Sequence, residues 1–461
     1  MKSLRDWCTG RWPVHSFGKL GGAAAGLMLA AAPLSLLPSA PALAQTYAAQ
    51  PAGQGLADFY RARRGAPLWL TPAAGDAADQ LLSLLSSANL DGLNPAKYNA
   101  AGIEAELQQA RARNKPKELL RVDQQLSQAF VSYVDDLRQD PGVGVTWVDP
   151  QLKPTPPSPL AALLTAAAQP SLSDYVHTMG WMHPYYAELR QALADHKYSD
   201  DHQRDTIEVN LRRIRVLPPS KGKYILVNAA QQKLFMFDGG KVVDSMVVVV
   251  GKTKYPTPTF AAYIRYAALN PYWYVPSDLA GDDVAQFVLK YGLKYLDQYG
   301  YKIVSDWSKN PTFIDPKTVD WKGVEDGKVQ IMIRQDPGPK NFMGRIKYMF
   351  PNPFGVYLHD NPRRDLFALP VRYESGGCVR VADAARLGHW LFGYDLDWKD
   401  AGTEQPVMLA QPVPVYIDYL TAVPDGNSIA FFDDAYKRDA AQLAKIEDSG
   451  TAVGAGSAAS R

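Results

Sequence analysis

A cysteine stands among glycines near the C-terminal end of the sequence. The stretch reads ESGGCVRV over residues 374–381, and His359 lies nineteen positions before Cys378. A thiol with an imidazole in reach is the arrangement that lowers a thiol pKa and produces a thiolate nucleophile. Gly376 and Gly377 leave backbone amides unshielded near the sulfur, and such amides can hold the oxyanion that forms when a thiolate attacks a carbonyl. The residue types therefore indicate nucleophilic attack on a carbonyl group.

Each of these residues also has a structural interpretation. A strand-like run precedes His359 and a helical pattern follows at residues 383–393, so we expect the thiol near the start of a helix. A lone histidine is more often structural, a Gly-Gly pair is more often only a turn, and Cys378 can also fill the core. Their coincidence in one short window favours catalysis. His359, Asp360 and Cys378 have no recognised metal-ligand spacing, so we expect no metal site.

The N-terminal segment has the order of a secretory signal. Basic residues precede an apolar stretch from Gly21 to Leu37, and the small residues of APALAQ suit cleavage after Ala44. An uncleaved membrane anchor is the alternative, but Pro33 and Pro38 interrupt a stretch already shorter than the roughly 20 residues that a spanning helix needs. We therefore expect residues 1–44 to be a cleaved signal peptide and the protein to be periplasmic.

Charge and cysteine content restrict the partners. The 461-residue chain has a formal net charge of +2 and no block of like charges, so we expect no nucleic-acid partner. Of the two cysteines, Cys8 lies in the predicted signal, which leaves Cys378 unpaired in an oxidising compartment. Such a cysteine is either a buried inert residue or a reactive thiol.

Helical periodicity dominates the first half of the predicted mature chain. Apolar residues recur at steps of three and four along residues 122–137, with Asp123 off the apolar face, and residues 79–95 indicate a second helix. A connection rich in proline and glycine follows over residues 140–160. We predict a helical scaffold domain over residues 45–215.

The period changes to that of strands near residue 222. Residues 223–251 alternate β-branched and aromatic runs with turn residues, which predicts a hairpin. A polar, partly helical insertion at residues 277–325 interrupts the later strands, and an insertion of that length is more often functional than idle. We predict an α+β multidomain fold with a mainly-β domain over residues 216–435 and a disordered tail over residues 436–461. The further strand candidates are residues 262–269, 328–334, 355–359 and 411–419.

The stretch from His359 to Arg380 resembles the signature of the L,D-transpeptidases of the YkuD type. That signature is a histidine followed, after a spacer, by Ser/Thr-x-Gly-Cys-x-Arg/Asn, which SGGCVR matches from Ser375 onward. Two longer stretches, DFYRARRGAPLWL and PGPKNFMGRIKYMFPNPFGVYLHD, are similar to the large YcbB-type branch of that family. The resemblance covers nearly all of the predicted mature chain.

The resemblance implies a role for each site residue. Cys378 would be the acylated nucleophile, His359 the base, and the backbone carbonyl of Asp360 the group that orients the imidazole. The amides around Gly377 and Cys378 would form the oxyanion hole. Arg380 would steady the loop or a substrate carboxylate. The residues that would line the substrate site are Tyr357, Ser375, Gly376 and Arg380.

Two departures from the family pattern concern substrate binding. Relatives usually carry histidine or serine immediately before the Gly-Cys pair, where this chain has Gly376. Many relatives also insert a small peptidoglycan-binding module between segments that correspond to residues 185–203 and 204–219, and here there is no room for one. Residues 277–325 resemble the capping subdomain that folds over the donor site. Substrate capture would then depend on the helical domain, the cap or the catalytic groove.

The resemblance implies acyl transfer between peptidoglycan stem peptides, as donor and acceptor, without a cofactor. The thiolate attacks an L-centre joined to a D-residue, the D-residue leaves, and the amine of a neighbouring stem attacks the thioester. Attack at the third stem residue gives a 3-3 cross-link, which we expect, whereas attack after L-Ala gives a 1-3 link. A carbapenem is the covalent inhibitor that the resemblance implies, and cell-wall synthesis proteins are the macromolecular partners to expect.

Two other classes of function stay open. A thiol hydrolase of peptidoglycan, such as a carboxypeptidase, endopeptidase or amidase, would form the same acyl-enzyme and pass it to water. A non-catalytic scaffold that binds the cell wall is the second, but the retention of Cys378, His359 and Arg380 together argues against it.

Overall fold

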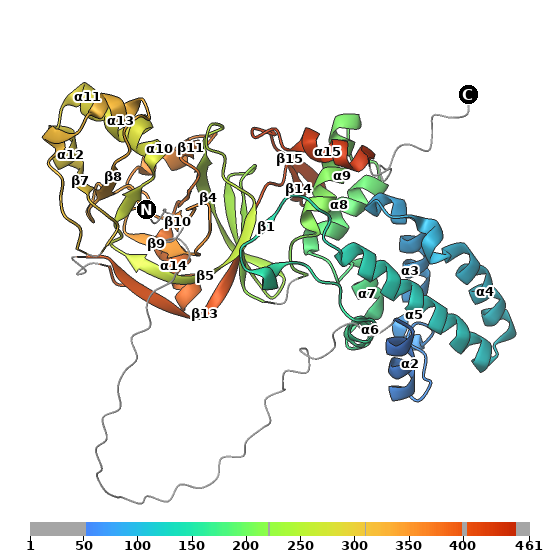
Figure 1. Ribbon diagram of the computed structural model, residues 1–461. Coiled ribbons are helices and arrows are strands. Elements are labelled where there is room, and N and C mark those ends of the chain that lie inside the picture. Colours follow the sequence, from blue (N-terminus) through green and yellow to red (C-terminus); the bar gives the residue numbers. More distant parts are fainter. Residues whose placement is uncertain (1–51, 220–221, 309, 399–402, 449–461) are drawn as a thin grey trace, which may run out of the picture.

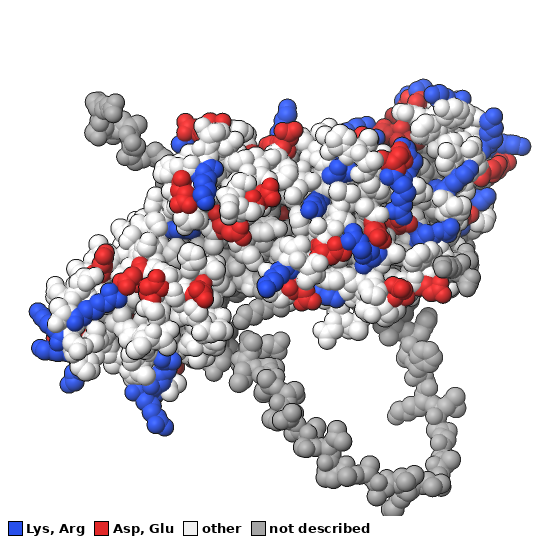
Figure 2. All heavy atoms as spheres, turned by 180° about the vertical axis from the view of Figure 1, so that it is seen from behind, with Lys and Arg blue, Asp and Glu red and all other residues white. Residues whose placement is uncertain are grey.

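The computed structural model describes residues 52–219, 222–308, 310–398 and 403–448. The chain forms a helical part and a mainly-β part that lie side by side (Figure 1). This arrangement confirms the predicted α+β multidomain fold. The predicted signal peptide lies outside the described residues, and no helix within those ranges is long and apolar enough to cross a bilayer. Acidic and basic side chains are interspersed over the face shown in Figure 2.

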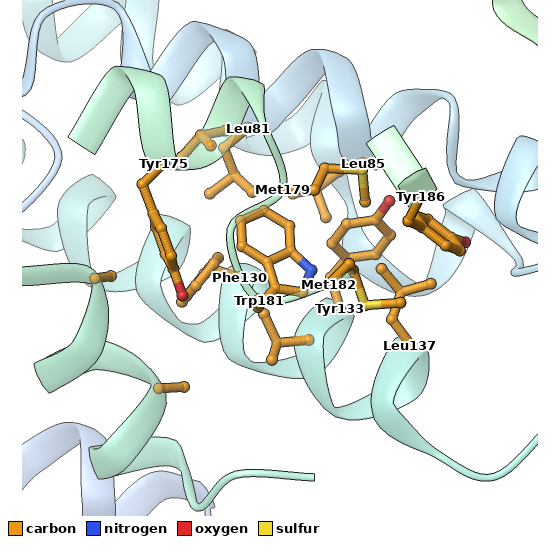
Figure 3. Packing of buried hydrophobic residues seen from close by; sticks show 14 of the residues in the cluster. Leu81, Leu85, Phe130, Tyr133, Leu137, Tyr175, Met179, Trp181, Met182 and Tyr186 are labelled. Carbon is orange, nitrogen blue, oxygen red and sulfur yellow. The ribbon is translucent and has the colours of Figure 1, made fainter. Parts of the chain in front are cut away.

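The helical part is organised around α5 (Pro116–Arg138), whose apolar side chains recur at helical spacing as the sequence predicts. Phe130 and Tyr133 are fully buried on this face and meet Trp181 edge to face, with ring centroids 5.2 and 6.3 Å apart (Figure 3). Such aromatic pairs stabilise a core beyond the burial of their area. The other helices of this part are α2 (Ala52–Ala62), α3 (Ala77–Ser86), α4 (Ala100–Arg113), α6 (Pro159–Ala167), α7 (Leu172–His177), α8 (Pro184–Ala194) and α9 (Asp201–Ile214).

One acidic side chain of α5 is buried instead of solvated. Asp123, which the sequence pattern places off the apolar face, is 0% exposed. Its carboxylate accepts the backbone N–H groups of residues 68–70 at 2.7 to 2.9 Å and the hydroxyl of Tyr60 at 2.5 Å. Hydrogen bonds of this number compensate for the loss of water around a carboxylate. Asp123 therefore fastens the segment after α2 to the central helix.

The mainly-β part is a closed barrel. Its strands follow the order β5-β13-β2-β3-β4-β12-β10-β9, and β9 pairs with both β10 and β5, which closes the sheet on itself. Inward-facing aliphatic side chains of these strands form an apolar core of their own. The strands are β2 (Tyr224–Asn228), β3 (Lys233–Asp238), β4 (Lys241–Gly251), β5 (Phe260–Leu269), β9 (Ile346–Met349), β10 (Leu358–His359), β12 (Val379–Val381) and β13 (Gln405–Asp418).

The connection over residues 140–160 is fastened to the barrel. It contains β1 (Thr146–Trp147), which pairs in parallel with the start of β5. Asp149 then accepts the backbone N–H of Tyr263 at 2.7 Å and an N–H of Arg265 at 2.5 Å. From the sequence this stretch is expected to be only a connection, because its prolines and glycines suppress any periodic signal. In the structure it runs beside β5, and β1 adds a short parallel strand at the start of β5.

The insertion forms a separate cap with its own core. A three-stranded sheet of β6 (Trp273–Val275), β8 (Met332–Gln335) and β7 (Tyr301–Val304) carries short helices on one side. The insertion is therefore wider than the predicted residues 277–325, and the strand expected at residues 328–334 pairs inside the cap and not with the barrel. The helical elements are α10 (Ser277–Leu279), a π-helical segment (Ala280–Ala285), α11 (Gln286–Tyr291), α12 (Lys294–Tyr299) and α13 (Trp321–Glu325).

The C-terminal segment returns to the helical part. The hairpin of β14 (Ala422–Asp425) and β15 (Ser428–Phe431) and the helix α15 (Asp439–Asp448) lie beside α8 and α9 (Figure 1). The expectation of a disordered tail from residue 436 is therefore wrong as far as residue 448, because Ile446 is buried at 1% exposure. The last predicted tail residues, 449–461, lie outside the described ranges.

Candidate active site

A cavity of about 1470 Å³ lies between the barrel and the cap. Side chains of β10 and β12 form its floor, and Leu279, Asp283 and Tyr295 of the cap contribute to the opposite wall. Lys254 and Tyr255, in the loop between β4 and β5, both contact the carboxylate of Asp282 in the cap. The cap is therefore held against the barrel beside the cavity.

Strand register brings the predicted site residues onto one surface. β10 and β12 run in parallel with Leu358 opposite Val379, and the Val379 N–H donates to the carbonyl of Tyr357 at 2.9 Å. Leu358 and Val379 are both 0% exposed in the barrel core. Because side chains alternate along a strand, the residues on either side of this pair face the cavity. These residues are Tyr357, His359, Cys378 and Arg380.

The turn that carries the nucleophile runs from β11 (Tyr373–Ser375) into β12. β11 is parallel to β4 and β12 is antiparallel to it, so the chain reverses direction over residues 376–378. Gly377 has a φ of +111°, a conformation that side-chain-bearing residues rarely adopt. A Cβ on Gly376 would lie 2.8 Å from Cδ1 of Leu279 in the cap. The two glycines thus serve different needs: Gly377 the sharp turn, and Gly376 the close approach of the cap.

Ser375 and the Gly377 amide hold this turn together. The Ser375 hydroxyl donates to the carbonyl of Cys378 at 2.6 Å and accepts the Gly377 N–H at 3.1 Å. Ser375 borders the cavity as expected, but it is only 1% exposed and both hydrogen bonds of its hydroxyl stay within the loop, so its side chain stabilises the turn. The Gly377 amide, expected in the oxyanion hole, is likewise already engaged. No hydrogen bond within the described chain uses the Cys378 N–H.

His359 is buried as a neutral imidazole. Its Nδ1 lies 2.6 Å from the carbonyl oxygen of Asp360, and because a carbonyl can only accept, Nδ1 carries the proton. Nε2 therefore carries the lone pair of a base. Burial, and next the charge of Arg380, lower the pKa of His359 to about 3. The Asp360 carboxylate pairs with Arg364 at 2.7 Å and accepts the Arg345 N–H at 2.9 Å, which fixes the orienting carbonyl.

The thiol of Cys378 is also neutral at rest. Burial raises its pKa, although the charge of Arg380 acts in the opposite direction. Sγ lies 3.5 Å from the carbonyl oxygen of Gly355, to which the thiol donates. The expectation of a helix start beside the sulfur is wrong, because β12 follows Cys378 and α14 (Ala384–Phe392) begins only at Ala384. A resting thiolate is therefore not favoured, and the proton must leave as the sulfur attacks.

Two cations near the thiol differ in their surroundings. Lys347 is 6% exposed, and its Nζ lies 5.0 Å from the ring centroid of Tyr357. Arg380 lines the cavity, and no hydrogen bond or ion pair joins its guanidinium to another residue in the part of the chain that the structure describes. Its guanidinium is therefore available to an anionic group of a ligand. No set of three His, Cys, Asp or Glu side chains in the described part of the chain is arranged to hold a metal ion.

Two neighbours of the nucleophile, Thr257 and Lys347, are not predicted from the sequence. Thr257 is 0% exposed, and its hydroxyl donates to the carbonyl of Gly377 at 2.9 Å. Its surroundings, YPTPTF, carry no periodic or motif signal. Lys347 lies in β9 directly opposite His359, so only the strand pairing reveals it.

Comparison with known proteins identifies both parts of the chain. Residues 54–193 match the family model of the scaffold domain, and residues 222–413 match that of the L,D-transpeptidase catalytic domain. A protein of Haemophilus influenzae, whose name provisionally assigns it as an L,D-transpeptidase, is 26% identical over 405 residues, which cover 83% of this chain and 78% of that protein.

A solved structure of the Ldtfm-avibactam carbamoyl enzyme is matched over 44% of this chain and about half, 51%, of its own, at 15% identity and a TM-score of 0.21. That similarity is too weak to bear on the fold. The two family models together with the curated relative agree with the geometry of the cavity. Residues 222–413 are therefore an L,D-transpeptidase catalytic domain, and residues 54–193 ahead of it are a scaffold domain.

Proposed function

We propose that this protein cross-links peptidoglycan stem peptides through a thioester on Cys378, with 3-3 links as the main product and 1-3 links as the alternative. The observation that supports this most directly is the strand register that places Cys378, His359 and Arg380 around one cavity. Residues 1–44 would direct the protein to the periplasm, where its substrate lies.

In the first half-reaction His359 acts as the base. As Sγ of Cys378 forms a bond to the donor carbonyl carbon, Nε2 of His359 takes the thiol proton. The carbonyl oxygen becomes an oxyanion, and the Cys378 N–H is the donor available to it. When the oxyanion collapses, the C–N bond breaks and the imidazolium passes its proton to the departing D-residue amine. The product is a thioester on Cys378.

The second half-reaction reverses these roles. The amine of an acceptor stem attacks the thioester carbon, and Nε2 of His359 removes one of its protons. The new C–N bond forms as the C–S bond breaks, and the sulfur recovers the proton. Burial keeps Nε2 of His359 unprotonated at neutral pH, so its lone pair can take a proton in each half-reaction once the developing charges of the transition state favour the imidazolium.

The cavity also fits this substrate class. Its volume of about 1470 Å³ exceeds the roughly 300 to 1,000 Å³ typical of a site for one small molecule, which suits two peptides at once. The guanidinium of Arg380 can form an ion pair with a carboxylate of the stem peptide. A carbapenem, whose strained carbonyl resembles the donor amide, would acylate Cys378 in the same position. Cell-wall synthesis proteins are the expected partners in the periplasm.

The proposal is tested with residues 45–461 and defined disaccharide-tetrapeptides, followed by mass spectrometry of the products. A cross-linked dimer supports transpeptidation. A 3-3 link releases the terminal D-Ala of the donor, whereas a 1-3 link releases the donor peptide that begins at D-Glu, and fragmentation of the dimer assigns the link. Release of the D-residue without a dimer would establish the hydrolase alternative. An unchanged substrate together with retained binding to cell-wall sacculi would establish the scaffold alternative.

A further inference from the structure

Thr257 links the nucleophile loop to the neighbouring loop between β4 and β5. Its hydroxyl accepts the N–H of Gly251 at 2.9 Å and donates to the carbonyl oxygen of Gly377, also at 2.9 Å. The side chain is 0% exposed, so water cannot replace either bond. One hydroxyl thus bridges the end of β4 and the turn that precedes Cys378.

This bridge acts on the peptide that contains the available amide. The Gly377 carbonyl and the Cys378 N–H belong to one peptide plane and point in opposite directions when the bond is trans. No cis peptide is present in the described chain. A carbonyl held on Thr257 therefore turns the Cys378 N–H away from Thr257, and a change at Thr257 would let that plane rotate.

Thr257 is itself held by the C-terminal segment. The Tyr436 hydroxyl accepts the Thr257 N–H at 3.4 Å and donates to the Gly251 carbonyl at 2.6 Å. Arg438 donates to the Thr257 carbonyl at 2.8 Å and to the Thr259 hydroxyl at 3.0 Å. The ring of Tyr436 stacks on Tyr419 of the barrel, with ring centroids 5.1 Å apart and an angle of 19° between the planes.

The same segment is anchored to the helical part. Asp439 accepts from Arg213 of α9 at 2.6 Å and from the hydroxyl of Thr421 at 2.7 Å. Asn210 of α9 accepts the Thr421 N–H at 2.9 Å and donates to the Thr421 hydroxyl at 2.8 Å. Hydrogen bonds at both ends of residues 436–439 therefore connect α9, through this short stretch of chain, to the loop beside the nucleophile.

We propose that residues 436–439 are a positioning element of the active site, which acts through Thr257 to orient the Cys378 N–H for oxyanion binding. The inference rests on the proposed acyl transfer, and it assigns to the C-terminal segment a role beyond the catalytic domain match, which ends at residue 413. Thr257 and Tyr436 are positioning residues, since neither is proposed to touch the substrate.

The test compares two reactions of the same sulfur. Acylation by a carbapenem passes through an oxyanion, whereas alkylation by iodoacetamide does not. Thr257→Val keeps the shape of the side chain and removes the bridge. Carbapenem acylation should slow by roughly ten- to a hundredfold, less than the roughly hundred- to thousandfold that follows complete loss of an oxyanion donor, because the Cys378 N–H stays in place but loses its orientation. Alkylation should keep its wild-type rate. Thr257→Ser, which retains the hydroxyl, should restore acylation.

Tyr436→Phe probes the C-terminal segment without disturbing its ring stacking. It should lower kcat for cross-linking, leave KM nearly unchanged and slow acylation without slowing alkylation. The matched control is Thr206→Val in α9, which also removes a buried threonine hydroxyl, one that donates at 2.7 Å to the carbonyl of His202. The control should react with both reagents as the wild type does.

Three results would overturn the inference: acylation of Thr257→Val at the wild-type rate, equal slowing of acylation and alkylation, or failure of Thr257→Ser to restore acylation. Equal slowing would mean that the loop has collapsed and that Thr257 serves only stability. A wild-type protein that is acylated but forms no cross-link would refute the proposed function alone, because the ratio of the two sulfur reactions would still report the orientation of the amide.

Discussion

At the nucleophile, burial acts against ionisation of both partners. It raises the pKa of the Cys378 thiol and lowers that of the His359 imidazole, so the site rests as a neutral pair. The charge of Arg380 favours the thiolate and disfavours the imidazolium. Substrate attack must therefore be coupled to proton transfer, and the departing amine can recover the proton from the same nitrogen.

Replacing Cys378 by alanine should abolish cross-linking and carbapenem acylation with little effect on the fold. The residue as a whole is partly exposed, it lines the cavity and not the apolar core of the barrel, and the hydrogen bond of its thiol to Gly355 is long, at 3.5 Å. The free energy of unfolding in urea should change by less than about 1 kcal/mol. Intact-protein mass spectrometry should show one carbapenem on the wild type, located in YESGGCVR, and none on the variant. A loss of several kcal/mol would instead favour the interpretation of Cys378 as a core residue.

At the scale of elements, the active site depends on the contact between the cap and the nucleophile turn. Leu279 of the cap occupies the space that a side chain at position 376 would need. The absence of a side chain at position 376 therefore leaves the space that Leu279 of the cap occupies. The hydrogen bonds from Lys254 and Tyr255 to the carboxylate of Asp282, which hold the cap to the barrel, also border this cavity.

Gly376→Ala should push the Leu279 side chain of the cap aside and slow cross-linking. The added Cβ would lie 2.8 Å from Leu279 Cδ1, a distance that Cβ atoms do not adopt, so one of the two must move. Leu279→Ala in the same chain should relieve the clash and recover most of the rate lost through Gly376→Ala. A steady-state comparison of the two single variants and the double variant measures this coupling. If the losses of cross-linking rate in the two single variants simply add in the double variant, position 376 and Leu279 are not coupled.

A second element-scale prediction concerns the attachment of the loop at residues 68–70 to α5. Asp123→Ala would leave buried N–H groups without an acceptor, and we expect it to lower the free energy of unfolding by about 3 to 5 kcal/mol. Asp135→Ala, an exposed position on the same helix, is the control and should stay within about 0.5 kcal/mol of the wild type. Urea denaturation followed by circular dichroism measures both. Equal stability of the two variants would contradict the structural role of Asp123.

At the scale of the whole molecule, the two parts meet at a buried histidine. His183, at the start of α8, accepts the Tyr185 N–H on Nδ1 at 3.2 Å, and its Nε2 lies 2.9 Å from the hydroxyl of Tyr224 in β2. It is 0% exposed, and burial lowers its pKa to about 3. Protonation on Nδ1 would break one of these contacts and place a charge in the joint between helices and barrel.

This joint predicts loss of stability in mild acid. An unfolded histidine binds its proton near pH 6.5, whereas folded His183 does so only near pH 3, so stability falls as the pH drops between these values. From pH 8 to pH 5 the cost from this one group is about 2 kcal/mol. His183→Gln should therefore lose about 2 kcal/mol less than the wild type over that interval, whatever its stability at pH 8. If urea titrations show that the wild type and His183→Gln lose the same free energy of unfolding between pH 8 and pH 5, this role of His183 is ruled out.

Local patterns in the sequence determine much of this molecule. The apolar spacing of residues 122–137 and the alternating run of residues 223–251 specify α5 and the hairpin of β2 to β4, because each periodicity buries one face whatever its partner is. The chemical types at Cys378, His359 and Arg380 and their match to a known signature point to the family. These properties depend on neighbours along the chain or on residue chemistry alone.

Tertiary structure decides what local pattern cannot. Whether the thiol and the imidazole are charged depends on how completely other segments exclude water, and which amide can bind an oxyanion depends on Ser375 already holding that of Gly377. The cap has a strand beyond its expected limit, and residues 436–448 fold against α9, because pairing and burial join segments far apart in sequence. Desolvation and long-range hydrogen bonding are properties of the assembled chain, so they leave no periodic trace in the sequence.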